Sequence, residues 1–122
     1  MAYIEDESVK KLKLNNQSGT VCSLECYYKD GHEGKTSRIG STGSIPVGQS
    51  VELDLSTIEE LNKKVDAGET IYVTAFANVK AGKDSHGNVW AKYNQDSNKT
   101  AEYTISGVIN FTEIAFNDVV ED

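Results

Sequence analysis

The chain has 122 residues, of which 38% are hydrophobic and 25% are charged, and this composition fits a single globular domain and excludes a disordered chain. Its 12 basic and 19 acidic side chains leave a formal net charge of −7, which repels nucleic-acid phosphates and anionic lipid headgroups. Nucleic acid is therefore excluded from the expected partners.

Residues 1–8 are acidic and polar apart from Tyr3 and Ile4, which predicts a flexible N-terminal arm. These two apolar side chains give the arm the means to dock on the sheet of a second copy, so a self-assembling subunit is one alternative function. The arm lacks the basic and apolar regions of a signal peptide, and no apolar stretch approaches the roughly 18 residues of a membrane helix. We therefore expect a cytoplasmic protein, with release by an unconventional route left open.

Alternating apolar residues predict the first strands of the domain. Residues 9–15 end in a leucine and lysine alternation typical of a strand with one buried face, and residues 20–28 form a second strand. In that strand Cys22 and Cys26 share a face but lie about 13 Å apart, beyond disulfide reach. We expect two reduced cysteines in the core and a reducing compartment, with metal binding or an intermolecular bridge as alternatives.

The next stretch is rich in glycine and predicts turns and edge segments. Residues 29–35 read as a hairpin loop, residues 36–39 as a short strand and residues 40–43 as a break. Residues 44–47 are expected at a sheet edge, because Pro46 cannot donate a hydrogen bond to a neighbouring strand.

A strand, a helix and the central strand follow in that order. Residues 50–55 alternate as a half-buried strand, and residues 56–59 match the spacing of a helix capping box. Apolar residues then recur at helical spacing up to Gly68, so one short helix is predicted. Residues 70–80, TIYVTAFANVK, combine length with little charge and predict a central strand with both faces covered.

The remaining segments predict three more strands and one long loop. Residues 81–88 are rich in turn formers and are the best candidate for a functional loop. Strands are expected at residues 89–93, 99–106 and 108–116, with Gly107 as the break between the last two.

Seven to eight short strands with turn signals between them predict an all-β fold. We expect a two-layer antiparallel β-sandwich, immunoglobulin-like or jelly-roll, with one short helix. The sandwich should span residues 9–117 as one domain, and residues 118–122 should form an acidic tail.

Two glycine-rich loops hold the candidate binding residues: Asp30, His32, Lys83, Asp84, His86, Asn88 and Trp90. An aromatic ring beside polar loop groups can stack on a sugar or anchor at an interface. The alternative for Trp90 is that its ring packs in the core or caps the sandwich. If both loops lie at one end of the sandwich, they predict a non-catalytic, lectin-like recognition module that binds a carbohydrate, lipid or protein surface.

Metal binding and catalysis are weaker alternatives. Four oxygen ligands of the kind that calcium needs occur in the loops: Asp84, Asn88, Asp96 and Asn98. Their spacing matches no EF-hand, so no cofactor is expected, with calcium as the alternative. A small hydrolase using Asp84, Ser85 and His86 is the second alternative function, but three consecutive residues rarely aim at one point and no nucleophile motif is present. We therefore predict that the protein is not an enzyme.

Three features follow one another in a characteristic order. The sequence LKLNNQSGTV opens a long strand at residues 12–21, GQSVELDL forms residues 48–55, and a Trp-bearing loop follows the central strand. In this layout most of the chain resembles the C-terminal β-sandwich domain of cholesterol-dependent cytolysins. The resemblance implies a β-sandwich whose function resides at one end.

Overall fold

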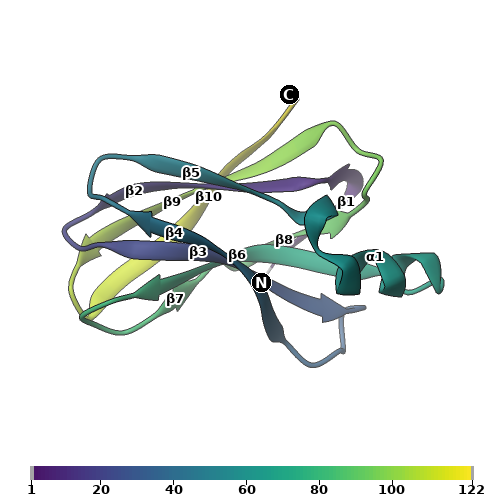
Figure 1. Cartoon of the computed structure of the whole chain (residues 1–122), viewed down its shortest axis with the longest axis horizontal. Helices are drawn as coiled ribbons and strands as arrows, with labels where there is room; N and C mark the ends of the chain where they lie inside the picture. The colour runs from purple at the N-terminus through teal and green to yellow at the C-terminus, as the bar shows by residue number, and fades with distance from the viewer. Residues whose placement is uncertain (1, 122) are drawn as a thin grey trace.

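The computed structural model describes residues 2–121 and shows two packed sheets with a short helix at one end (Figure 1). In chain order the elements are β1 (Ala2–Val9), β2 (Lys11–Ser18), β3 (Cys22–Asp30), β4 (Ser37–Ile45), β5 (Ser50–Asp54), η1 (Leu55–Thr57), α1 (Glu59–Asp66), β6 (Ile71–Val79), β7 (Ser85–His86), β8 (Val89–Tyr93), β9 (Lys99–Val108) and β10 (Phe111–Glu121). The predicted all-β sandwich with one short helix is confirmed. Met1 of the expected arm and Asp122 of the expected tail lie outside the described residues.

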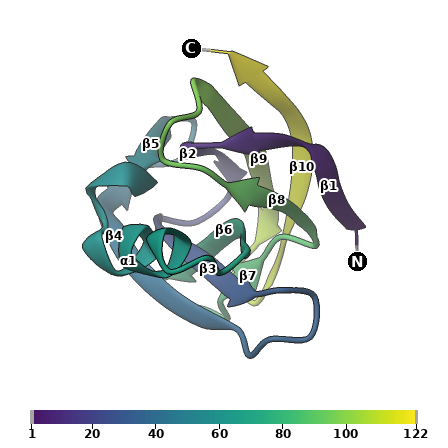
Figure 2. The same ribbon diagram turned by 90° about the vertical axis from the view of Figure 1, so that its right-hand side faces the viewer.

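The larger sheet has the strand order β1-β8-β6-β3-β4, with β7 paired to β6, and the smaller sheet has the order β10-β9-β2-β5. Figure 2 shows the two layers from the helix side. Most neighbours are antiparallel, but β1 runs parallel to β8 and β2 runs parallel to β9. Both β1-β2 and β8-β9 pass from the larger to the smaller sheet at the helix side, which makes the two pairings parallel.

Strand β6 is the centre of the larger sheet, as predicted. It pairs with β3 on one side and with β8 and β7 on the other. Eight of its nine residues are buried, so both of its faces are covered. On its inner face Ile71, Val73 and Ala75 belong to the same core cluster as Leu12 and Leu14 of β2, across the sandwich. The alternation in the sequence thus identified the core side of both sheets.

Residues expected to be mobile or broken are regular strands. The predicted arm is the edge strand β1, where Tyr3 pairs beside Trp90 and Ile4 beside Ala91, so these side chains complete the chain's own sheet. The predicted tail continues β10 up to Glu121. Strand β4 runs through the expected break at residues 40–43, because shifts in its register with β3 accommodate the glycines. Strand β1 and the short β7 raise the strand count above the predicted one.

The helix begins later than the capping-box spacing predicted. Asp54 instead caps η1, since its Oδ1 accepts a hydrogen bond from the Ser56 amide at 3.0 Å. The N-cap of α1 is Ile58, which makes no side-chain capping bond. Gly68 follows the helix with φ of 90°, as expected for a glycine at a helix end. Among the described residues, no helix is long and apolar enough to cross a membrane.

Cys22 and Cys26 are free, lie on the same face of β3 and have no exposed surface. Burial raises the pKa of both thiols, and the thiolate is the reactive form. We therefore expect no adduct when the native protein is treated with iodoacetamide at pH 8, and two adducts after unfolding in urea, both read by mass spectrometry. A rapid adduct on the folded protein would contradict the core position of these residues.

Candidate functional site

The two loops predicted to share one end lie at opposite ends of the sandwich. Asp30 lies opposite Ile71, the first residue of β6, whereas the loop with Lys83 and Asp84 follows the last residue of that strand. Because β6 has nine residues, the two loops are about 26 Å apart at roughly 3.3 Å per residue. The prediction of one site from both loops is therefore wrong. We call the end with α1 the helix end and the opposite end the loop end.

Trp90 does not contact solvent, so its position is that of a packed residue and disfavours its predicted role in binding. Its side chain is 1% exposed and lies on the outer face of the larger sheet. The ring of Tyr27 stacks on it at a centroid distance of 5.7 Å, and the ammonium group of Lys29 lies 4.7 Å from its ring centroid. A second layer of side chains therefore covers the outer face of this sheet and excludes ligands from the indole.

His32 belongs to the same outer layer, where it attaches β1 to the rest of the sheet. Its ring stacks on Tyr3 with centroids 3.9 Å apart, and its Nε2 lies 3.1 Å from the Tyr72 hydroxyl. That hydroxyl donates to Glu5 at 2.5 Å, which lowers the pKa of Glu5, while burial and the Glu5 carboxylate raise the pKa of Tyr72 to about 12. These contacts join β1, β6 and the β3-β4 loop.

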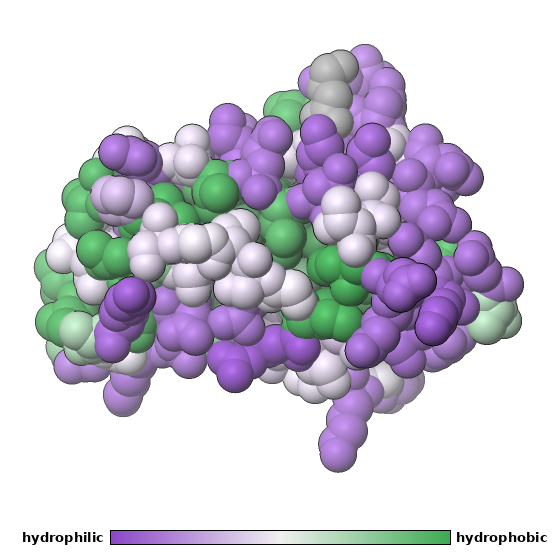
Figure 3. Space-filling view, in the orientation of Figure 1, coloured by the Kyte–Doolittle hydropathy of each residue, from purple (hydrophilic) through white to green (hydrophobic). Residues whose placement is uncertain are grey.

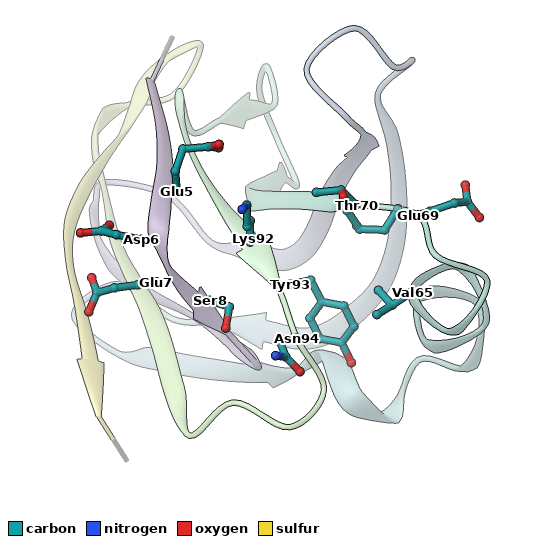
Figure 4. A pocket seen from close by; sticks show the side chains of 11 residues that line it. Glu5, Asp6, Glu7, Ser8, Val65, Glu69, Thr70, Lys92, Tyr93 and Asn94 are labelled. Carbon is teal, nitrogen blue, oxygen red and sulfur yellow. The ribbon is translucent and has the colours of Figure 1, made fainter.

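An open hollow of about 410 Å³ lies at the helix end between β1, β8 and α1 (Figure 4). None of the predicted binding residues lines it. Glu7 faces away from it and pairs with Lys99 at 3.1 Å. The Asp30 carboxyl raises the pKa of Glu69 through a hydrogen bond, so both groups are engaged with each other. Glu5, Glu7 and Glu69 of this hollow therefore already have partners within the chain.

The loop end exposes large apolar side chains. Green side chains gather there in Figure 3, at its left-hand side, whereas the helix end is mainly hydrophilic. Phe111 is the most exposed at 79%, although its side chain could bury more apolar area than any other in the group. We call these five residues the apolar tip: Val21, Val47, Val108, Ile109 and Phe111.

The β9-β10 turn that presents most of the apolar tip is held in place by the β6-β7 loop. Gly107 and Asn110 have φ of 101° and 68°, which glycine and asparagine tolerate best. The Asn110 side chain accepts a hydrogen bond from the Lys83 amide at 3.1 Å. Gly82 is needed for this approach, because a Cβ atom there would lie 2.7 Å from Cγ1 of Ile109. The turn is thus built by packing between segments distant in sequence.

The loops of the apolar tip carry a small positive charge, although the chain as a whole is acidic. The loops of the tip, residues 19–21, 46–49, 80–84 and 109–110, contain two lysines and one aspartate, a formal charge of 2 − 1 = +1. The whole chain has a net charge of −7. The repulsion that excludes anionic surfaces from the protein as a whole is therefore weaker at the apolar tip than the net charge of the chain implies.

A polar hollow of about 340 Å³ lies beside the tip, between the β7 segment and β10. Strands β7 and β10 lie next to each other, at the lower left of Figure 1. The structure thus brings three predicted binding residues together, and adds three β10 residues that the sequence alone did not place there. The polar hollow is lined by Asp84, Ser85, His86, Asn88, Thr112, Glu113 and Ile114.

The residues of the alternative hydrolase do not form a catalytic arrangement. Ser85 and His86 are successive strand residues, so their side chains point to opposite sides. The Ser85 hydroxyl donates to the Thr112 carbonyl at 3.0 Å, whereas the His86 ring lies 4.9 Å from that of Tyr27. The serine is therefore not oriented by the histidine, as a nucleophile would need.

The four candidate calcium ligands are also divided between the two ends. Asp84 and Asn88 flank β7, whereas Asp96 and Asn98 lie in the β8-β9 turn at the helix end. Within residues 2–121, no three His, Cys, Asp or Glu side chains are grouped to hold a metal ion.

Comparison with known proteins supports the fold and no more than the fold. No protein-family model matches the sequence, and no curated protein matches it. The NMR structure of a protein from Eubacterium rectale matches with a TM-score of 0.51 and 10% identity, over 94% of this chain and 95% of that chain. A structure named "Trapped Toxin" matches with a TM-score of 0.40 and 10% identity, over 88% of this chain and 23% of that one.

The membrane-binding domain of pneumolysin matches with a TM-score of 0.38 and 8% identity, over 92% of this chain and 97% of that domain. The resemblance to a cytolysin sandwich domain noted in the sequence therefore has a weak structural counterpart. The Eubacterium rectale protein, with a TM-score of 0.51 at 10% identity, shows a shared fold alone.

Proposed function

We propose that this chain is a non-catalytic binding module that docks on a lipid surface through its apolar tip. The observation that carries the proposal is the concentration of five large exposed apolar residues at one end, with Phe111 79% exposed. Contiguous apolar patches on a protein surface mark sites of interaction with proteins or membranes. The β6-β7 loop also holds the β9-β10 turn, so the apolar side chains of Val108, Ile109 and Phe111 are presented together.

The chemistry of the tip favours a lipid surface over the other two expected ligands. Protein-binding hot spots are enriched in Trp, Tyr and Arg, and none of these occurs among the five tip residues. Trp90, the expected stacking residue for a sugar, is buried. Lys80 and Lys83 stand in the tip loops, where ammonium groups on long stems suit a headgroup layer.

Replacing apolar tip residues should weaken lipid binding. Burying one phenylalanine contributes about 1.5–3 kcal/mol, so the I109S/F111S variant should bind phosphatidylcholine vesicles at least tenfold more weakly than the wild type in a co-sedimentation assay. Val120→Ser is the matched control, because Val120 is 37% exposed on β10 but lies outside the tip. We expect this control to bind as the wild type does.

Two results would contradict the proposal. One is wild-type protein that stays in the supernatant at all vesicle concentrations. The other is an I109S/F111S variant that keeps its circular dichroism spectrum and still binds with unchanged affinity. Sedimentation velocity without vesicles tests the competing use of the tip, because pairing of two copies through it would give a dimer that the same variant abolishes.

A further inference from the structure

We infer that the polar hollow beside the apolar tip binds an uncharged, hydroxyl-rich ligand, namely a sugar unit. The geometry of the hollow alone supports the binding of a sugar. The further idea that this sugar is the headgroup of a glycolipid rests on the proposed lipid docking. The hollow opens between β7 and β10, and β10 also begins with Phe111 of the tip. A headgroup projecting from a surface under the tip would meet this hollow.

The groups in the hollow are those that hydrogen-bond to hydroxyls. A hydroxyl both donates and accepts, so it needs carboxylate or imidazole acceptors together with amide donors. Glu113 and Asp84 supply carboxylates, Asn88 supplies an amide, and His86 supplies an imidazole. The volume of about 340 Å³ is at the lower end of the range of about 300–1,000 Å³ for small-ligand sites.

One hydrogen bond of the His86 ring indicates which of its two nitrogens donates. Its Nδ1 lies 2.9 Å from the carbonyl of Gly87. A carbonyl can only accept, so Nδ1 is the nitrogen that carries the proton in the neutral ring. In that tautomer Nε2 is the ring nitrogen that can accept a hydrogen bond.

The charge balance of the hollow favours a neutral ligand over a cation or an anion. Asp84 is already compensated, because its Oδ2 lies 3.8 Å from Nη1 of Arg38 and its Oδ1 accepts from the Val79 amide at 2.9 Å. A cation would therefore meet a single uncompensated carboxylate, that of Glu113. An anion would be repelled by the same group.

The wall that carries His86 is fixed before any ligand arrives. Gly87 packs so closely that a Cβ atom there would lie 3.1 Å from the ring of buried Tyr103. On the outer face, the His86 ring rests against Tyr27, which stacks on Trp90. A site whose groups need little ordering loses less affinity on binding.

The inference is tested by saturation-transfer NMR with a panel of free sugars: glucose, galactose, mannose and N-acetylglucosamine. We expect a signal from at least one of them with the wild type, and a loss of at least fivefold in the N88A/E113Q variant. Both substituted side chains are exposed, and thermal unfolding checks that the variant is folded. N98A/E60Q is the matched control, since it makes the same changes at exposed positions of the helix end and should leave the signal unchanged.

The tip variant separates this inference from the proposed lipid docking. I109S/F111S should keep the sugar signal even though it loses vesicle binding. Adding galactosylceramide to phosphatidylcholine vesicles should strengthen wild-type binding and not that of N88A/E113Q. If the free sugar binds but galactosylceramide does not strengthen vesicle binding, the sugar site is supported and its ligand is a soluble glycan.

Three results would overturn the sugar site. They are no signal from any sugar of the panel, an undiminished signal in folded N88A/E113Q, and a stronger response to the cation glucosamine or the anion glucuronic acid than to every neutral sugar.

Discussion

The Trp90→Ala protein is expected to lose about 3–5 kcal/mol of folding free energy, because truncating a buried large aromatic removes its transfer free energy and leaves a cavity. The indole is 1% exposed and lies between the sheet and the covering side chains of Tyr27 and Lys29. The free energy of unfolding of domains of this size is about 5–15 kcal/mol, so the expected loss is a large share of it. Urea denaturation followed by circular dichroism measures the change.

Trp90→Phe is the control that separates ring volume from the indole nitrogen. Nε1 is buried and has no hydrogen-bond partner within the described residues, so removing it takes away an unsatisfied donor. We expect this variant to lose about 1–2 kcal/mol, much less than the alanine variant. If Trp90→Ala kept wild-type stability and lost only ligand binding, the buried position of the ring would be contradicted.

The Lys29→Ala protein is expected to lose about 2–4 kcal/mol, an unusual cost for a lysine. This side chain is only 4% exposed, and its ammonium group lies 4.8 Å from the Tyr3 ring centroid and 4.7 Å from that of Trp90. Each such contact contributes about 0.5–2 kcal/mol. The ammonium also donates to the Tyr3 hydroxyl and, at 3.2 Å, to the His32 carbonyl.

The Lys29→Met protein distinguishes the charge from the packing of the stem. It keeps most of the apolar stem, so we expect a loss between zero and that of the alanine variant. Lys63→Ala, at an exposed helix position, should change stability by less than about 0.5 kcal/mol. Hydrogen exchange should show the β1 amides opening first in Lys29→Ala, because Tyr3 holds that strand. If the β1 amides exchanged at the same rate in Lys29→Ala as in the wild type, this role of Lys29 would be contradicted.

Several elements of this fold could be predicted from the sequence because their signals are local. Alternation over a few residues identified strands β2, β3, β6 and β8, and for β2 and β3 it also identified the face turned to the core. The shared burial of Cys22 and Cys26 follows from a period of two. Asp84, His86 and Asn88 lie within one turn-rich segment, so the sequence alone predicted that they are close in space.

The partners of those residues could not be read in the same way. Thr112 and Glu113 reach the polar hollow because β10 passes beside β7, and such pairings join segments about 25 residues apart. Phe111 was absorbed into a predicted strand at residues 108–116, although the turn lies at residues 109–110, where Asn110 has positive φ. Three large apolar residues around a turn are the signal that could have identified the tip.

The sequence by itself determined that this chain is acidic and all-β, with its two free cysteines in the core, because composition and alternation act within a few residues. Only the tertiary structure decided that Asp30 and Asp84 lie at opposite ends, that Trp90 is covered, and that residues 2–9 complete the chain's own sheet. Alternation fixes which way a side chain points relative to its neighbours in the strand. Strand order and long-range contacts such as those of Lys29 decide what that side chain meets.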